Sequence, residues 1–138
     1  RYRTRDLTHL IYDKCRCGRT MVRMGRILGR SDDMLIIRGV NVFPSTIESC
    51  ILEFPEYTGQ YFITVDRVNN VDTFDVDVEL RPDFANASED EKKGLKDKLV
   101  NRLVSVLGIK PSLHIVEPNS IERSQGKAKH VLDKRKLV

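Results

Sequence analysis

The sequence predicts an α+β fold in which two helices cover one face of a small sheet. Three observations predict it: apolar and acidic residues alternate strictly between 74 and 80, two segments have amphipathic helical patterns, and short β-rich runs flank them. Read in order from residue 34, the elements are β-α-β-β-α-β. A strand-rich segment precedes them.

The first strand is expected at residues 34–38, an isoleucine-rich run that turns at Gly39. A helix should follow, because Ser45 and Glu48 have the spacing of a capping box, and Pro55 should end it. Its apolar face would consist of Ile47, Cys50, Ile51 and Phe54.

A hairpin is expected next. Residues 60–66 are β-rich, Asn69-Asn70 is a turn signal, and residues 74–80 alternate between apolar and acidic side chains. One face of this hairpin should therefore be exposed to water.

The second helix should begin with another capping box, Ser88 with Glu91, and end at Gly108. A short strand at residues 113–117 should follow it, and residues 118–138 form a polar, basic tail. The apolar stripe of this helix comprises Leu95, Leu99, Leu103 and Val106 or Leu107.

Charge divides the chain into two parts. Residues 1–30 hold 9 Lys+Arg and 2 Asp+Glu, net +7, which leaves 15 and 18, net −3, for residues 31–138. We therefore assign residues 1–31 to the end of a preceding domain and residues 32–138 to a domain of their own. The chain begins at Arg1 without methionine, inside a strand-like run, so we expect it to be a fragment.

The composition is that of a globular, cytoplasmic protein. Of the 138 residues, 40% are hydrophobic and 32% charged, no apolar run approaches the roughly 18 residues of a membrane helix, and there is no signal-peptide pattern. The 3 cysteines make an odd count, which does not suit a disulfide framework.

Asp6 is the first candidate site residue. In an extended segment Tyr2, Thr4 and Asp6 point to the same side, and a carboxylate there could accept hydrogen bonds from both hydroxyls of a ribose. The alternative is that Asp6 offsets the charges of Arg3 and Arg5.

Arg30 and Asp32 lie in a tight turn between two strand-like runs. Arg30 offers a planar donor fork suited to phosphate or ribose oxygens, and Asp32 stands where the chain changes direction. An ordinary surface turn would use the same residue types.

Lys127 follows a glycine in the segment Ser124-Gln125-Gly126-Lys127. An ammonium on a flexible stem is a compact charge for a phosphate or an activated carboxylate, and the glycine lets the backbone approach such a ligand. The alternative is a solvated basic tail, since five further cations surround it: Arg123, Lys129, Lys134, Arg135 and Lys136.

Cys15 and Cys17 could supply part of a zinc site. Two thiolates and nearby His9 fall short of four ligands, so the remainder would come from an absent part of the protein. The alternative is two reduced surface thiols, and Cys50 on an apolar helix face is expected to pack in the core.

Residues 2–6, 29–48 and 125–127, taken in order, resemble the C-terminal end of an adenylate-forming enzyme of the phenylacetate-CoA ligase family. Such enzymes join ATP and a carboxylic acid to an acyl-adenylate, with Mg²⁺, and then transfer the acyl group to coenzyme A. The resemblance spans nearly the whole chain. One departure from the wider superfamily is Arg5, where many members have glycine.

The resemblance implies a role for each candidate residue. Asp6 would hold the ribose hydroxyls, Arg30 would contact the same nucleotide, and Asp32 would be the hinge of a mobile C-terminal lid. Lys127 would be the catalytic lysine of adenylation, and Gly39 would face the coenzyme A channel in the second step. The larger N-terminal adenylation domain would be the lid's partner, so the isolated chain should be inactive.

Two other functions compete with a ligase. The isoelectric point of about 9.1 and the basic ends would suit a nucleic-acid-binding module, although residues 31–138 are net negative and lack a basic strand studded with aromatic residues. Exposed strand edges would suit a non-catalytic domain that forms a homodimer.

Overall fold

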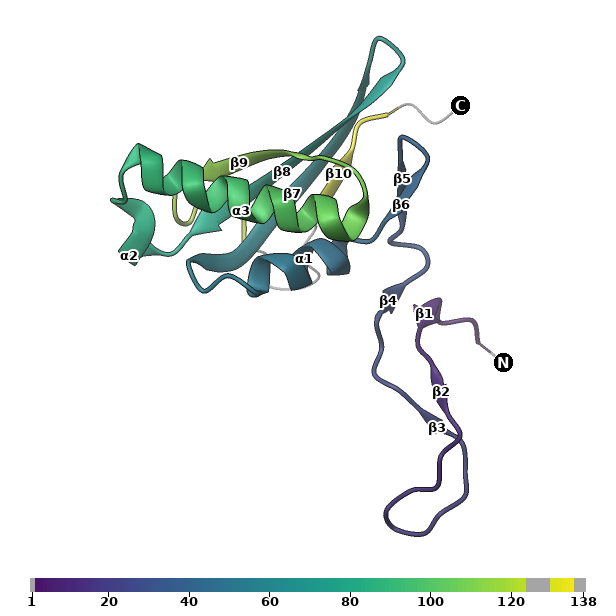
Figure 1. Ribbon diagram of the computed structural model, residues 1–138. Coiled ribbons are helices and arrows are strands. Elements are labelled where there is room, and N and C mark those ends of the chain that lie inside the picture. Colours follow the sequence, from purple (N-terminus) through teal and green to yellow (C-terminus); the bar gives the residue numbers. More distant parts are fainter. Residues whose placement is uncertain (1, 124–129, 136–138) are drawn as a thin grey trace. The chain divides into compact units, whose positions relative to one another are not determined.

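A computed structural model describes residues 2–123 and 130–135 (Figure 1). The chain divides into two compact units, residues 1–34 and 35–138, which we call the N-terminal unit and the C-terminal unit. The sequence-based boundary lay between residues 31 and 32.

The N-terminal unit is a ribbon of four two-residue strands. Strand β1 (Asp6–Leu7) pairs antiparallel with β4 (Gly29–Arg30), and β2 (Leu10–Ile11) pairs antiparallel with β3 (Arg23–Met24). None of its described residues is buried. The ribbon therefore has no core of its own.

The C-terminal unit contains a four-stranded sheet in the order β10-β7-β8-β9. The long strands β7 (Tyr57–Val68) and β8 (Val71–Leu80) form the predicted hairpin, and β9 (Ser112–Val116) and β10 (Val131–Asp133) add to its two edges in parallel. Asn69 and Asn70 have φ of 51° and 63°. Positive φ at both central residues is the geometry that a two-residue hairpin turn requires, which confirms the turn signal.

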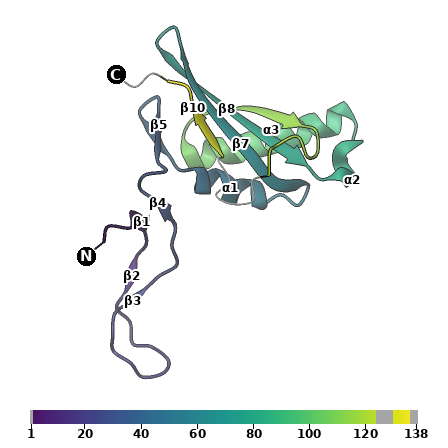
Figure 2. The ribbon, with the colours of Figure 1, turned by 180° about the vertical axis from the view of Figure 1, so that it is seen from behind.

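Two helices, α1 (Pro44–Leu52) and α3 (Glu89–Leu107), cover one face of this sheet, and a single turn, α2 (Pro82–Ala85), precedes α3 (Figures 1 and 2). The predicted α+β class is thereby confirmed. The core between helices and sheet comprises Ile37, Val42, Ile47, Cys50, Ile51, Tyr57, Tyr61, Ile63, Val65, Phe74, Val76, Val78, Leu80, Leu99, Val100, Leu103, Leu107, Ile109 and Leu113. No helix in residues 2–123 and 130–135 is long and apolar enough to cross a membrane.

The capping box predicted for α1 is wrong. The helix begins at Pro44, its N-cap is Phe43 without a side-chain cap, and the Ser45 carbonyl accepts a hydrogen bond from Ser49 Oγ at 2.9 Å. Proline sets the helical φ at the first position, so this helix starts without a polar cap. Its predicted apolar face is confirmed by the burial of Ile47, Cys50 and Ile51.

The capping box of α3 is confirmed. The Glu91 amide donates to Ser88 Oγ at 3.3 Å, and the Ser88 amide donates to Glu91 Oε2 at 2.9 Å. The helix ends at Gly108 with φ of 76°, a left-handed cap that glycine adopts without steric cost. Of the two candidates for the last position of the apolar stripe, Leu107 is buried and Val106 is exposed.

The first expected strand does not join the main sheet. Strand β5 (Leu35–Ile37) pairs instead with β6 (Val40–Val42) in a separate hairpin. The place at the sheet edge belongs to β10, which comes from the tail expected to be only polar and basic. A three-residue strand gives too short an alternation to be recognised within a basic run.

Candidate functional site

Three predicted site residues meet in the N-terminal unit. The β1–β4 pairing places Asp6 directly opposite Arg30, and the Arg30 guanidinium donates from Nε and Nη2 to the two carboxylate oxygens of Asp32 at 3.0 and 2.9 Å. Arg5 Nη1 lies 3.8 Å from the same carboxylate. The pairing of two strands thus gathers residues that are distant in sequence into one charged cluster.

The ion pair between Arg30 and Asp32 shifts the pKa of both side chains. The hydrogen bond with Asp32 raises the pKa of Arg30. Desolvation would raise the pKa of Asp32, but the hydrogen bond from Arg30 and the charges of Arg30 and Arg5 outweigh it, so this pKa lies below its usual value. Because two of its five donors hold Asp32, Arg30 keeps others for a second acceptor such as a ribose or phosphate oxygen.

Arg5 has a strained backbone within this cluster. Its φ is 66°, and its carbonyl accepts hydrogen bonds from the Ser31 amide at 2.8 Å and from Ser31 Oγ at 3.2 Å. A left-handed arginine is uncommon, and glycine would adopt this φ at no cost. The contacts from Ser31 therefore hold Arg5 in this conformation.

Gly39 lies in the C-terminal unit, in the two-residue turn between β5 and β6. It has φ of 79°, and no atom lies within 4 Å of the place where a side chain would begin. The position therefore requires glycine for its backbone conformation and not for lack of space.

Lys127 lies outside the described residues, but both flanks of its segment are described. On the upstream flank the Ile121 amide donates to Glu79 Oε1 at 2.8 Å, and Arg123 Nη2 lies 3.5 Å from Glu79 Oε2. On the downstream flank the His130 ring stacks on Tyr61, with centroids 4.5 Å apart and planes at 12°. Each flank is thus fixed to the central hairpin.

Glu79 is a residue that the sequence analysis misplaced. The alternation put it on the wet face of the hairpin, yet its exposed fraction is 0%. Residues 121–123 return over that face and cover the carboxylate. No local pattern could have revealed this, because the covering segment is 42 residues away in sequence.

Cys15 and Cys17 occupy a turn in which the Gly18 amide donates to the Cys15 carbonyl at 2.9 Å. A hydrogen bond from the Arg19 backbone lowers the pKa of the exposed Cys17 thiol. Among residues 2–123 and 130–135, no group of three or more His, Cys, Asp or Glu could hold a metal ion. The zinc site stays a prediction that needs ligands from elsewhere.

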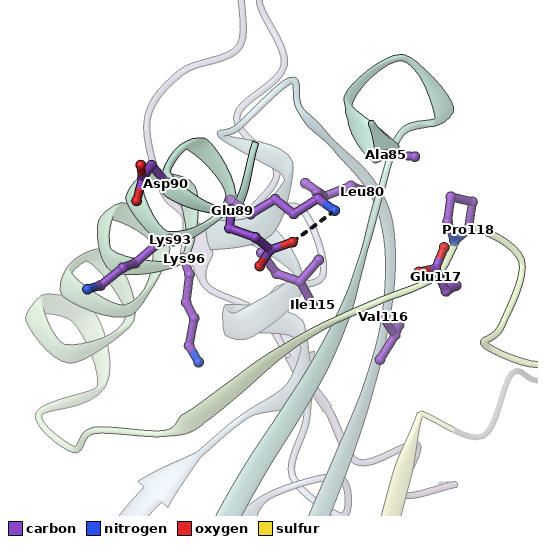
Figure 3. A pocket seen from close by; sticks show the side chains of 11 residues that line it. Leu80, Ala85, Glu89, Asp90, Lys93, Lys96, Ile115, Val116, Glu117 and Pro118 are labelled. Atoms are coloured by element: carbon purple, nitrogen blue, oxygen red, sulfur yellow. Dashed lines mark ion pairs between the residues drawn. The ribbon is translucent and has the colours of Figure 1, made fainter. Parts of the chain in front are cut away.

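A surface groove of about 600 Å³ lies beside the start of α3, between that helix, Leu80 and the end of β9 (Figure 3). Its charges are mixed, and Lys92 pairs with Glu89 across 3.7 Å. No predicted site residue lines it. The groove therefore does not add to the candidate site.

Comparison with known proteins decides the family. A sequence profile described as "AMP-binding enzyme C-terminal domain" matches residues 39–135. The chain belongs to this family. The phenylacetate-coenzyme A ligase of Aromatoleum evansii is 44% identical over an alignment of 138 positions that covers 98% of this chain and 30% of that enzyme. The chain thus spans less than a third of this relative, and the resemblance seen in the sequence is confirmed.

Solved structures agree. The structure of 2-hydroxyisobutyryl-CoA ligase in the postadenylation state, in complex with R3-HIB-AMP, has a TM-score of 0.82 and 34% identity, covering 94% of this chain and 28% of that one. A domain of phenylacetate-coenzyme A ligase from Bacteroides vulgatus has a TM-score of 0.70 and 29% identity, covering 78% of this chain and 97% of that one. The fold is therefore that of an adenylate-forming ligase's C-terminal domain.

Proposed function

We propose that this chain is the C-terminal part of an AMP-forming acyl-CoA ligase that activates phenylacetate or a related aryl or other carboxylic acid with ATP and transfers the acyl group to coenzyme A. The observation that carries the proposal is the 44% identity to a phenylacetate-coenzyme A ligase over 98% of this chain. The nucleic-acid and dimerisation alternatives have no comparable observation in their favour.

In the first half-reaction the carboxylate of the acid attacks the α-phosphorus of ATP, the bond to the pyrophosphate breaks, and pyrophosphate leaves. Asp6 would accept hydrogen bonds from the ribose hydroxyls, and Arg30 would donate to the same nucleotide. Lys127 would bridge the carboxylate and α-phosphate oxygens and stabilise the charge that develops there. The pairing of β1 with β4 supports this assignment, because it puts Asp6 opposite Arg30.

In the second half-reaction the thiol of coenzyme A attacks the acyl carbon and AMP leaves. Residues 32–138 would rotate about Asp32 as a lid, withdraw Lys127 and present Gly39 to the channel of the thiol. Mg²⁺ or zinc would need ligands from outside residues 2–123 and 130–135, because no group of three or more His, Cys, Asp or Glu among these residues could hold a metal ion.

The test is Lys127→Ala in the full-length enzyme, with Lys129→Ala in the same segment as the matched control. We expect adenylation to slow on the order of 100-fold or more, because a preorganised charge is lost. The rate of pyrophosphate release measures this step. Attack of coenzyme A on preformed phenylacetyl-adenylate should change little, and Lys129→Ala should change neither step. Equal losses in both steps would refute the role given to Lys127.

A second measurement tests whether this chain needs the preceding domain for activity. Residues 1–138 alone should form no acyl-CoA from phenylacetate, ATP and coenzyme A, because the acid's pocket would lie in the preceding domain. Measurable turnover by the isolated chain would contradict the proposal.

A further inference from the structure

The turn that carries Gly39 has an unusual first residue. Arg38 and Gly39 connect β5 to β6 with φ of 50° and 79°. Two-residue turns of this kind strongly prefer Asn, Asp or Gly at both positions, so an arginine with positive φ there is strained. Such a conformation persists only where its surroundings hold it.

Asp72 on β8 holds this turn. The Arg38 amide donates to Asp72 Oδ2 at 3.2 Å, and Arg38 Nε donates to the Asp72 carbonyl at 2.8 Å. These bonds join residues that are 34 positions apart in the sequence. Both the backbone and the side chain of the strained residue are thus fixed to one point on the hairpin.

Arg135 completes the arrangement from the other side. Its side chain is 6% exposed, and its Nη1 donates to the Ile36 carbonyl at 2.6 Å and to Asp72 Oδ2 at 3.1 Å. Its Nη2 donates to Asp133 Oδ2 at 2.7 Å, and Arg67 Nε donates to Asp72 Oδ1 at 2.8 Å. The buried carboxylate of Asp72 therefore joins β5, the hairpin tip and the chain after β10.

The two residues of the strained turn lie at the surface. Arg38 and Gly39 are exposed and add no apolar burial themselves, although Ile37 directly before them is buried in the core. A buried carboxylate and a buried guanidinium are costly to desolvate, and here the carboxylate of Asp72 contacts the turn directly while Arg135 holds that carboxylate and the Ile36 carbonyl before the turn. Strained turns that several surrounding contacts hold in place are typical of sites where the backbone contacts a ligand.

We propose that Asp72 and Arg135 are positioning residues that hold the Arg38-Gly39 turn in the shape in which it receives the thiol arm of coenzyme A. The inference rests on the proposed function, which places Gly39 beside that channel. Under this inference the network of Asp72 and Arg135 serves the second half-reaction. It is distinct from the Glu79 and Tyr61 contacts that flank Lys127.

The experiment is Asp72→Asn in the full-length enzyme, with Asp77→Asn on the same strand as the matched control. Attack of coenzyme A on preformed acyl-adenylate should slow roughly tenfold or more, since small displacements of a reacting site are costly. The rate of adenylation should stay within about twofold of that of the unaltered enzyme, because the turn does not position the groups that react in that step. Asp77→Asn should alter neither step. Equal slowing of both half-reactions by Asp72→Asn would overturn the inference.

Rescue distinguishes positioning from a merely structural role. Asparagine favours positive φ, so Arg38→Asn added to Asp72→Asn should restore part of the coenzyme A step without restoring the network. If Asp72→Asn does not fold, Arg135→Lys takes its place, because it loses the forked contacts but keeps the charge. Its slowing must again be selective for the coenzyme A step, and an unselective or absent effect overturns the inference.

The two proposals fail separately. An enzyme that makes acyl-CoA and loses adenylation with Lys127→Ala, but loses both steps equally with Asp72→Asn, keeps the proposed function and refutes only the positioning role. A full-length enzyme that forms no acyl-CoA refutes both.

Discussion

The two units of the chain differ in how they are held together. Among the described residues, the C-terminal unit buries 19 apolar side chains, whereas the N-terminal unit buries none. The N-terminal ribbon instead exposes a series of large apolar residues: Tyr2, Leu7, Leu10, Tyr12, Met21, Val22, Met24, Ile27 and Leu28. One unit stabilises itself, and the other has the surface of a segment made to pack against something else.

The largest effect should come from the core of the C-terminal unit. Leu103 on α3 has an exposed fraction of 0%, so Leu103→Ala should lower the free energy of unfolding by about 2–5 kcal/mol through lost burial and a cavity. Urea denaturation measures this. Val106→Ala on the same helix, where the side chain is 41% exposed, is the control. Equal losses at both positions would break the comparison between core and surface.

A smaller effect on stability should distinguish the carboxylate of Asp72 in the C-terminal unit from that of Asp32 in the N-terminal unit. Hydrogen bonds from Arg67 and from the Arg38 amide, with the charge of Arg135, lower the pKa of Asp72. Its stabilisation is therefore present above the unfolded pKa of about 3.9 and is lost as the pH falls through the lower folded value.

Thermal unfolding from pH 7 to pH 3 measures this contribution. The Tm of Asp72→Asn should lie below that of the unaltered chain at neutral pH, and the gap should narrow as the pH falls through the unfolded pKa of about 3.9. Asp32→Asn removes a more exposed ion pair of the N-terminal unit and should give a smaller gap. A gap at Asp72 that stays constant down to pH 3 would contradict the assignment.

The smallest effect should be in the N-terminal unit. Met24 lies opposite Leu10 in the β2–β3 pair and is 64% exposed, so Met24→Ser should change the unfolding free energy of this chain by no more than about 0.5 kcal/mol. The same substitution in the full-length enzyme should cost more if the preceding domain covers this face. Equal small effects in both proteins would show that nothing packs there.

The sequence was informative where a local rule decides the structure. The Asn69-Asn70 turn, the Ser88 capping box and the Gly108 cap depend on residues within a few positions, and all three are as predicted. The cap proposed at Ser45 failed because Pro44 already provides a start for the helix.

Long-range pairing could not be predicted in the same way. The strand at residues 35–37 pairs with its own hairpin partner and not with the main sheet, and the edge place goes to residues 131–133. Arg30 and Asp32 could be singled out because they share one short turn, although their mutual ion pair was not predicted. The roles of Asp72, Glu79 and Arg135 could not be predicted, because Arg38, Ile121 and Ile36, which they contact, lie 34, 42 and 99 residues away.

The placement of the cysteines has a practical consequence. The Cys17 thiol is exposed with a lowered pKa, whereas burial raises the pKa of Cys50 inside the C-terminal unit. At neutral pH a maleimide dye should therefore attach to residues 15–17 and leave the other unit unlabelled. A second fluorophore, introduced on α3, would allow energy transfer to follow the proposed rotation about Asp32 one molecule at a time.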